Sequence, residues 1–201
     1  WVWLKVQFRN QDVKYFINNF SGAKKVSAPT LECHHGIYYL RYLVTEYVNI
    51  NKSELRNQRI LAVDLGINHD AVCSVIDING TILARKFIDL AKEKDHLYHK
   101  LNQLKGFQQK NGSHNSKKQW NFVNYVNKEI SCKTANAIVD MAVLYNVDIV
   151  VMEHLDIKGK KHGSKAQRLT LWRKQAITNM VEHGIHRFCI KFSTVNPRNT
   201  S

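Results

Sequence analysis

The chain has 201 residues, 44% of them apolar, and its 30 lysines and arginines outnumber 16 aspartates and glutamates, which gives a formal charge of +14. Such an excess attracts polyanions through counterion release at phosphates, and we expect a nucleic-acid partner, with a ribosomal-type or membrane-surface protein as the alternative. No stretch approaches the roughly 20 apolar residues of a membrane span. Four cysteines without any C-x-x-C argue for a reducing compartment, and against a disulfide framework or a zinc site within these residues.

The first 50 residues predict β-structure. Apolar and polar residues alternate over 1–9, and further runs cover 12–20, 26–33 and 37–47, the last two flanking the turn-like His34-His35-Gly36. Aromatic residues mixed with lysine and arginine suit an oligonucleotide-binding barrel, although most single rings fit cross-strand packing better. Polar residues over 49–58 predict a linker.

From residue 59 onward the pattern is that of an α/β domain. Strands are predicted at 59–64, at 71–78 and 81–88 around an Asn-Gly hairpin turn, at 147–153 and at 185–195. Helices are predicted at 90–107, at 120–145, and from Ser164 as N-cap to Gly184 at the C-terminal end. This order resembles the ribonuclease H-like arrangement, a mixed sheet with flanking helices in which the first and fourth strands are neighbours.

Two strands of this domain each end in a carboxylate. The apolar run 60–63 and the run 147–152, apolar except for Asp148, lead into Asp64 and Glu153, and strands that are apolar at nearly every residue predict coverage on both faces. Acids at the carboxyl ends of neighbouring parallel strands lie side by side, and such a pair repels unless a cation neutralises it. The alternative is that each acid caps a turn. Three nearby acids are expected at solvated loop positions, namely Asp70, Asp148 and Asp156.

A basic stretch follows the second acid. No acidic residue interrupts it between Asp156 and Glu182, so we expect it to hold phosphates rather than to form an ordinary solvated helix face. Its cationic residues are Lys158, Lys160, Lys161, Lys165, Arg168, Arg173 and Lys174.

Several motifs resemble the transposon-encoded TnpB proteins and their relatives, the type V CRISPR effectors. Residues 62–68 (AVDLGIN) resemble the first RuvC motif of these proteins, and residues 150–155 (VVMEHL) resemble the second. Residues 197–201 (PRNTS) are similar to the segment that leads into their zinc ribbon. Residues 131–140 and 158–161 also look like this family, and the resemblance covers 59–201 well but 1–58 only loosely.

The resemblance implies an RNA-guided DNA endonuclease that binds a guide RNA and a DNA target in the prokaryotic cytoplasm, near the nucleoid. Residues 1–58 would be the C-terminal part of a β-barrel domain that binds nucleic acid, and 59–201 an incomplete RuvC-like nuclease domain. Asp64 and Glu153 would hold Mg²⁺ or Mn²⁺ for two-metal hydrolysis. The third acid, an Asp, and a structural Zn²⁺ are expected only beyond residue 201.

Two other functions remain compatible with the sequence. One is a catalytically inactive family member that binds guide RNA and DNA, and the other is a structure-selective nuclease that needs no RNA. Both ends of the chain read as interior sequence, so we expect a longer protein and expect this part alone to be inactive as a nuclease.

Overall fold

The chain divides into two units, Trp1–Asn49 and Ile50–Ser201. The structure is a computed structural model that describes residues 5, 7–20, 25–45, 47, 54, 57–66, 68–112, 116–154 and 173–196. Of the basic stretch, therefore, only Arg173 and Lys174 lie within the described residues.

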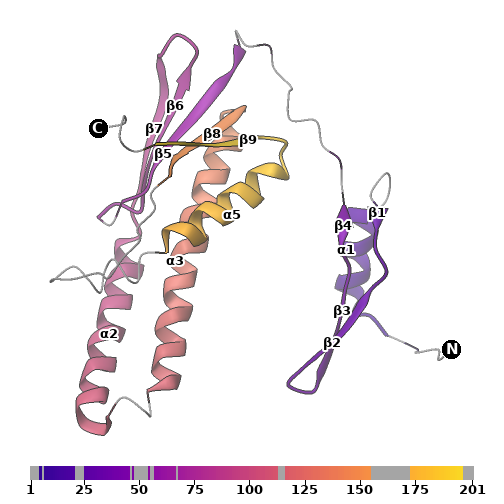
Figure 1. Cartoon of the computed structure of the whole chain (residues 1–201), viewed down its shortest axis with the longest axis vertical. Helices are drawn as coiled ribbons and strands as arrows, with labels where there is room; N and C mark the ends of the chain where they lie inside the picture. The colour runs from indigo at the N-terminus through magenta and orange to yellow at the C-terminus, as the bar shows by residue number, and fades with distance from the viewer. Residues whose placement is uncertain are drawn as a thin grey trace. The chain divides into compact units, whose positions relative to one another are not determined.

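The larger unit is built on a five-stranded sheet with the order β7-β6-β5-β8-β9 (Figure 1). The first three strands are antiparallel neighbours, whereas β5 pairs with β8, and β8 with β9, in parallel. The strands are β5 (Arg59–Asp64), β6 (Ala71–Asp77), β7 (Ile82–Ile88), β8 (Ile149–Glu153) and β9 (Lys191–Val195). The prediction that the first and fourth strands of this domain are neighbours is confirmed.

The Asn-Gly turn between β6 and β7 forms where it is predicted. Gly80 has a φ of +81°, a left-handed conformation that glycine adopts without steric cost. The Asp77 carboxylate accepts the backbone N–H groups of Asn79 at 2.9 Å and Thr81 at 2.8 Å. Asp77 therefore closes the turn from the end of β6 and fixes the register of the hairpin.

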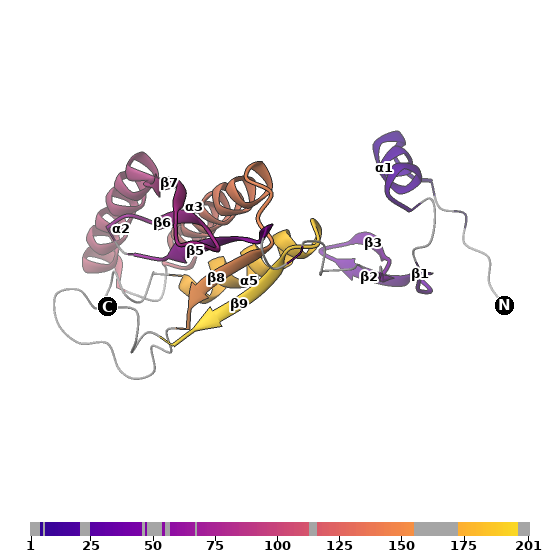
Figure 2. The same ribbon diagram turned by 90° about the horizontal axis from the view of Figure 1, so that it is seen from above.

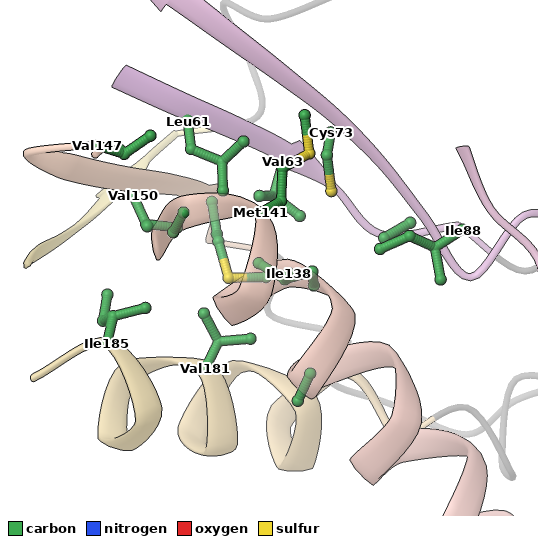
Figure 3. Close-up of a cluster of buried hydrophobic side chains, with 14 of the residues drawn as sticks. Leu61, Val63, Cys73, Ile88, Ile138, Met141, Val147, Val150, Val181 and Ile185 are labelled. Carbon is green, nitrogen blue, oxygen red and sulfur yellow. The ribbon is translucent and has the colours of Figure 1, made fainter. Parts of the chain in front are cut away.

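Two of the three described helices of this unit, α3 (Lys117–Leu144) and α5 (Lys174–His186), cover one face of the sheet. Figure 3 shows Ile138 and Met141 of α3 among the buried side chains of the strands, with Val181 and Ile185 of α5 next to them. The helix α2 (Ala91–Asn111), predicted at 90–107, packs along α3 through Leu97, Leu101 and Leu104, which recur at helical spacing. No described helix is long and apolar enough to cross a membrane.

The opposite face of the sheet is only half-buried among the described residues. In β5, Leu61 and Val63 are buried while Ile60 and Ala62 are half-buried, and β8 alternates in the same way. The predicted coverage on both faces is therefore not found in the part of the chain that the structure describes. An apolar run shows that both faces avoid water, but it does not identify what covers the second one.

The last helix and strand differ from the prediction in their bounds. The helix α5 runs from Lys174 through Gly184 to His186, so β9 starts at Lys191, whereas the predicted N-cap Ser164 lies outside the described residues. Gly184 lies inside the helix, at a close contact with α3 (Figure 2 shows both helices from above). A Cβ atom at this position would lie 2.8 Å from the Val139 side chain, so the glycine serves the packing of the two helices rather than the end of α5. The chain turns instead at Cys189, which has a φ of +61°.

The smaller unit contains a helix that the sequence did not predict. The helix α1 (Asn10–Phe20) replaces the strand expected at 12–20, and Arg9 pairs with Asp12 at 2.8 Å in its first turn. The strands β1 (Lys25–Val26) and β4 (Val44–Thr45) pair, as do β2 (Thr30–His34) and β3 (Ile37–Arg41) around the predicted His-His-Gly turn. The assignment of residues 1–58 to a β-barrel domain stays a prediction.

Candidate metal centre

Asp64 and Glu153 lie side by side at the carboxyl ends of β5 and β8. Val63 is the register partner of Met152, so the next residue of each strand reaches the same level of the sheet, about 4.8 Å apart in backbone position. Both acids follow a buried residue and so point away from the α3 and α5 side. Asp64 is exposed and Glu153 is half-buried. The fold thus brings together the two acids singled out in the sequence.

The loop that follows Asp64 makes a tight turn. A Cβ atom on Gly66 would lie 2.8 Å from the backbone oxygen of His69, so only glycine fits there without a shift of the backbone. The loop ends at Asp70, whose backbone N–H donates to the Ile88 carbonyl at 2.9 Å. Its carboxylate accepts the N–H of Leu90 at 2.8 Å. Asp70 is 9% exposed, so its expected position in a solvated loop is wrong.

Lys94 in the first turn of α2 fastens this loop. Its ammonium group donates to the Asn68 carbonyl and lies 3.2 Å from the Asp70 carboxylate and 2.6 Å from that of Asp89. The hydrogen bond from Lys94 holds the pKa of Asp89 below its usual value. Lys94 therefore links the loop after Asp64 to the start of α2, in addition to the hydrogen bond between Asp70 and the Leu90 N–H.

We expect Lys94→Met to destabilise the domain by about 1–2 kcal/mol at pH 7, because it leaves the Asp70 carboxylate buried without its cation. The pKa of Asp89 is lower in the folded protein, so its pairing with Lys94 stabilises the fold above the unfolded pKa of about 4 and is lost as the pH falls below it. The variant should lack this loss. Urea unfolding at pH 3 to 7 measures both effects, with the exposed Lys92→Met as the control. Equal stability of the two variants would contradict the proposed fastening.

Lys174 is the third charged side chain at the acidic pair. It is the first residue of α5, it is 9% exposed, and its ammonium group donates to the backbone oxygen of Glu153 at 2.8 Å. Burial lowers the pKa of Lys174, and the negative charges of Glu153 and of Asp64 partly offset that effect. The sequence predicted Lys174 as one of the phosphate-binding residues of the basic stretch, and that role stays a prediction. Its position at the carboxyl end of β8, in contact with the Glu153 backbone, follows from the tertiary structure.

The remaining candidate residues are placed as follows. Arg173 precedes α5 and donates to the Asn124 side chain at 3.1 Å. Asp148 lies at the opposite end of β8, where it accepts the N–H of Arg59 at 2.9 Å and joins the two central strands. The predicted phosphate-binding residues Lys158, Lys160, Lys161, Lys165 and Arg168 lie outside the described residues, as does Asp156.

The donor set at the strand ends suits a hard cation but is incomplete. Two carboxylates supply the oxygen ligands that Mg²⁺ and Mn²⁺ prefer. Among the described residues no group of three histidine, cysteine, aspartate or glutamate side chains is placed to hold a metal ion. Asp64 and Glu153 thus fit part of a divalent-cation site, and further ligands have to come from water, substrate or another acid.

The fold is α/β, a ribonuclease H-like (RuvC) mixed sheet with flanking helices. It is similar to a Cas12f1–sgRNA–target DNA complex, with a TM-score of 0.53 and 19% identity over 85% of this chain and 42% of that one. It is also similar to a CRISPR-Cas12f ternary complex, with a TM-score of 0.53 and 17% identity over 94% of this chain and 38% of that one. The chain therefore spans less than half the length of these Cas12f proteins.

A more distant match is RuvC of T. thermophilus bound to a Holliday junction, with a TM-score of 0.42 and 8% identity over 71% of this chain and 66% of that one. No family model matches the sequence, and no curated protein does. The likeness to Cas12f establishes the fold. What the protein does has to be argued from its own residues.

Proposed function

We propose that the intact protein is an RNA-guided DNA endonuclease of the TnpB type. The observation that carries the proposal is the placement of Asp64 and Glu153 on adjacent parallel strands, at one rim of a ribonuclease H-like sheet. The formal charge of +14 supports a nucleic-acid substrate, because it favours binding to phosphate backbones. One of the Cas12f proteins with the similar fold, Cas12f1, is in complex with an sgRNA and target DNA.

In this proposal Asp64 and Glu153 hold Mg²⁺ or Mn²⁺ through their carboxylate oxygens. When bound, the metal supplies an activated water and stabilises the leaving oxygen of the phosphodiester. The chain's own residues do the rest. The loop from Gly66 to Asp70 keeps Asp64 at the rim, and the basic residues from Lys158 to Arg173 orient the phosphates of the substrate. Base pairing to the guide selects the target.

The experiment is cleavage of plasmid DNA by the intact protein, purified together with the RNA that it binds in cells. We expect a target matching that RNA to be cut in the presence of Mg²⁺, and cutting to stop with EDTA or after ribonuclease treatment. Cleavage that survives ribonuclease would support a structure-selective nuclease. Target binding without cleavage in Mg²⁺ and in Mn²⁺ would support the inactive, binding-only alternative and contradict the proposal.

A further inference from the structure

A buried lysine at a pair of carboxylates needs an explanation, because burial costs an ammonium group several kcal/mol unless charges nearby compensate it. At Lys174 part of this compensation comes from the end of β8, where the Glu153 backbone carbonyl accepts its hydrogen bond at 2.8 Å. The negative charges of Glu153 and of Asp64, on the neighbouring strand end, act against the lowering of the Lys174 pKa by burial. Only 9% of Lys174 is exposed, so it is not a surface lysine that meets the acids by chance.

The two carboxylates are also stabilised by a nearby positive charge. Two carboxylates on neighbouring strand ends repel each other, and that repulsion falls when a cation lies beside them. Two other cationic residues near the strand ends are directed elsewhere, since Lys94 pairs with Asp70 and Asp89, and Arg173 donates to Asn124. Among the lysines and arginines that the structure describes, Lys174 combines burial at the start of α5 with a hydrogen bond to the β8 strand end.

We propose that Lys174 is the resident counter-ion of the acidic pair, holding Asp64 and Glu153 in place before a divalent cation binds and then opposing that cation. The inference rests on the proposed function, because it takes the two acids to be metal ligands. Lys174 is a positioning residue in this account. Before a metal ion binds, the positive charge of the Lys174 ammonium group reduces the repulsion between the two carboxylates. Once the metal binds, the same charge repels it, so the affinity for the metal is lower than it would be without Lys174.

A purely structural lysine predicts something different. If the hydrogen bond to the Glu153 carbonyl only anchors α5 to β8, loss of the lysine weakens the site, and metal affinity falls or stays the same. If Lys174 is the counter-ion, removal of its charge raises the affinity for a divalent cation, because like charges repel at short range. The sign of the change in affinity therefore distinguishes the two roles.

The test is Mn²⁺ binding, measured by electron paramagnetic resonance of the free ion, for the intact wild-type protein and four variants of it. Lys174→Gln keeps a side-chain donor but removes the charge, and we expect it to bind Mn²⁺ about tenfold more tightly. Lys174→Arg keeps the charge and should bind like the wild type. Lys191→Gln is the matched control, since it removes the same charge at the opposite end of the sheet, where Lys191 is exposed and pairs with Ile149. Asp64→Asn removes a proposed metal ligand and should abolish Mn²⁺ binding.

The outcomes separate this inference from the proposed function. Wild-type binding that is absent, or that survives Asp64→Asn, contradicts the metal site and therefore the proposed function. Binding that Asp64→Asn abolishes, but that Lys174→Gln leaves equal or weaker, overturns only the role of Lys174. Should Lys174→Gln unfold in EDTA, folding restored by Mn²⁺ supports the counter-ion role, and failure to fold in saturating Mn²⁺ overturns it.

Discussion

Replacing Asp64 by Asn should reduce DNA cleavage by the intact protein at least about a thousandfold while leaving guide RNA and target binding within about twofold. Asparagine has nearly the shape of aspartate but lacks the negative charge that neutralises a divalent cation. Asp64 is exposed at the end of β5, so we expect the variant to keep the fold. Single-turnover cleavage in Mg²⁺ and a filter-binding assay with labelled target measure the two quantities.

Asp148→Asn is the matched control for this prediction. It removes the same charge from the same pair of strands, but at the opposite end of β8, where Asp148 accepts the backbone N–H of Arg59. An asparagine oxygen can accept that hydrogen bond, so cleavage should stay within a few-fold of the wild type. Equal losses in both variants would point to the strand pairing rather than to a metal ligand, and full activity of Asp64→Asn would refute the proposed site.

The central part of the fold was predictable because its signals are local. The Asn-Gly turn, the strands at the apolar runs and the helix predicted at 120–145 depend on residues close together in the sequence, and all three form in the structure, although coverage of both sheet faces is not found among the described residues. The pairing of β5 with β8 is not local. It was predicted from the order of the elements, which few α/β topologies satisfy. The adjacency of Asp64 and Glu153 followed from that order.

The predictions failed where one pattern fits two structures. In α1, Val13, Tyr15 and Ile17 alternate as in a strand, but Val13, Phe16 and Ile17 also have helical spacing. Asp12 in the first turn favours the helix, because an acid there interacts well with the helix dipole. Gly184 is a similar case, since a glycine near the end of a helix predicts a cap, whereas here it allows α3 and α5 to approach closely.

The site had two residues whose roles the sequence could not reveal. Asp70 and Lys174 are charged residues in polar or basic surroundings, and a charged residue is normally solvated. Both are buried because elements distant in sequence meet at the strand ends. The start of α2 covers Asp70, and the start of α5 lies against the end of β8. The proposed metal ligands could be predicted from strand ends, but the buried positions of Asp70 and Lys174 near them required the tertiary structure.

The packing beneath the site leads to the second large effect. Ile138 is fully buried on α3 and lies among Leu61 and Val63 of β5 and Met141 of its own helix (Figure 3). We expect Ile138→Ala to lower the free energy of unfolding by about 2–5 kcal/mol, because it removes buried methyl groups and leaves a cavity. Alanine favours a helix more than isoleucine does, so helix propensity works against this loss rather than adding to it. Urea denaturation followed by far-UV circular dichroism measures the change.

Leu144→Ala on the same helix is the matched control. Leu144 has as many side-chain carbons as Ile138 but is 74% exposed, so its truncation should change the unfolding free energy by less than about 0.5 kcal/mol. Equal effects at the two positions would show that α3 does not pack on the sheet as described. Because Ile138 supports the β5 strand that ends in Asp64, its variant should also weaken Mn²⁺ binding, whereas Leu144→Ala should leave that binding unchanged. The acids at the rim are therefore expected to depend on the core that fixes the strands behind them.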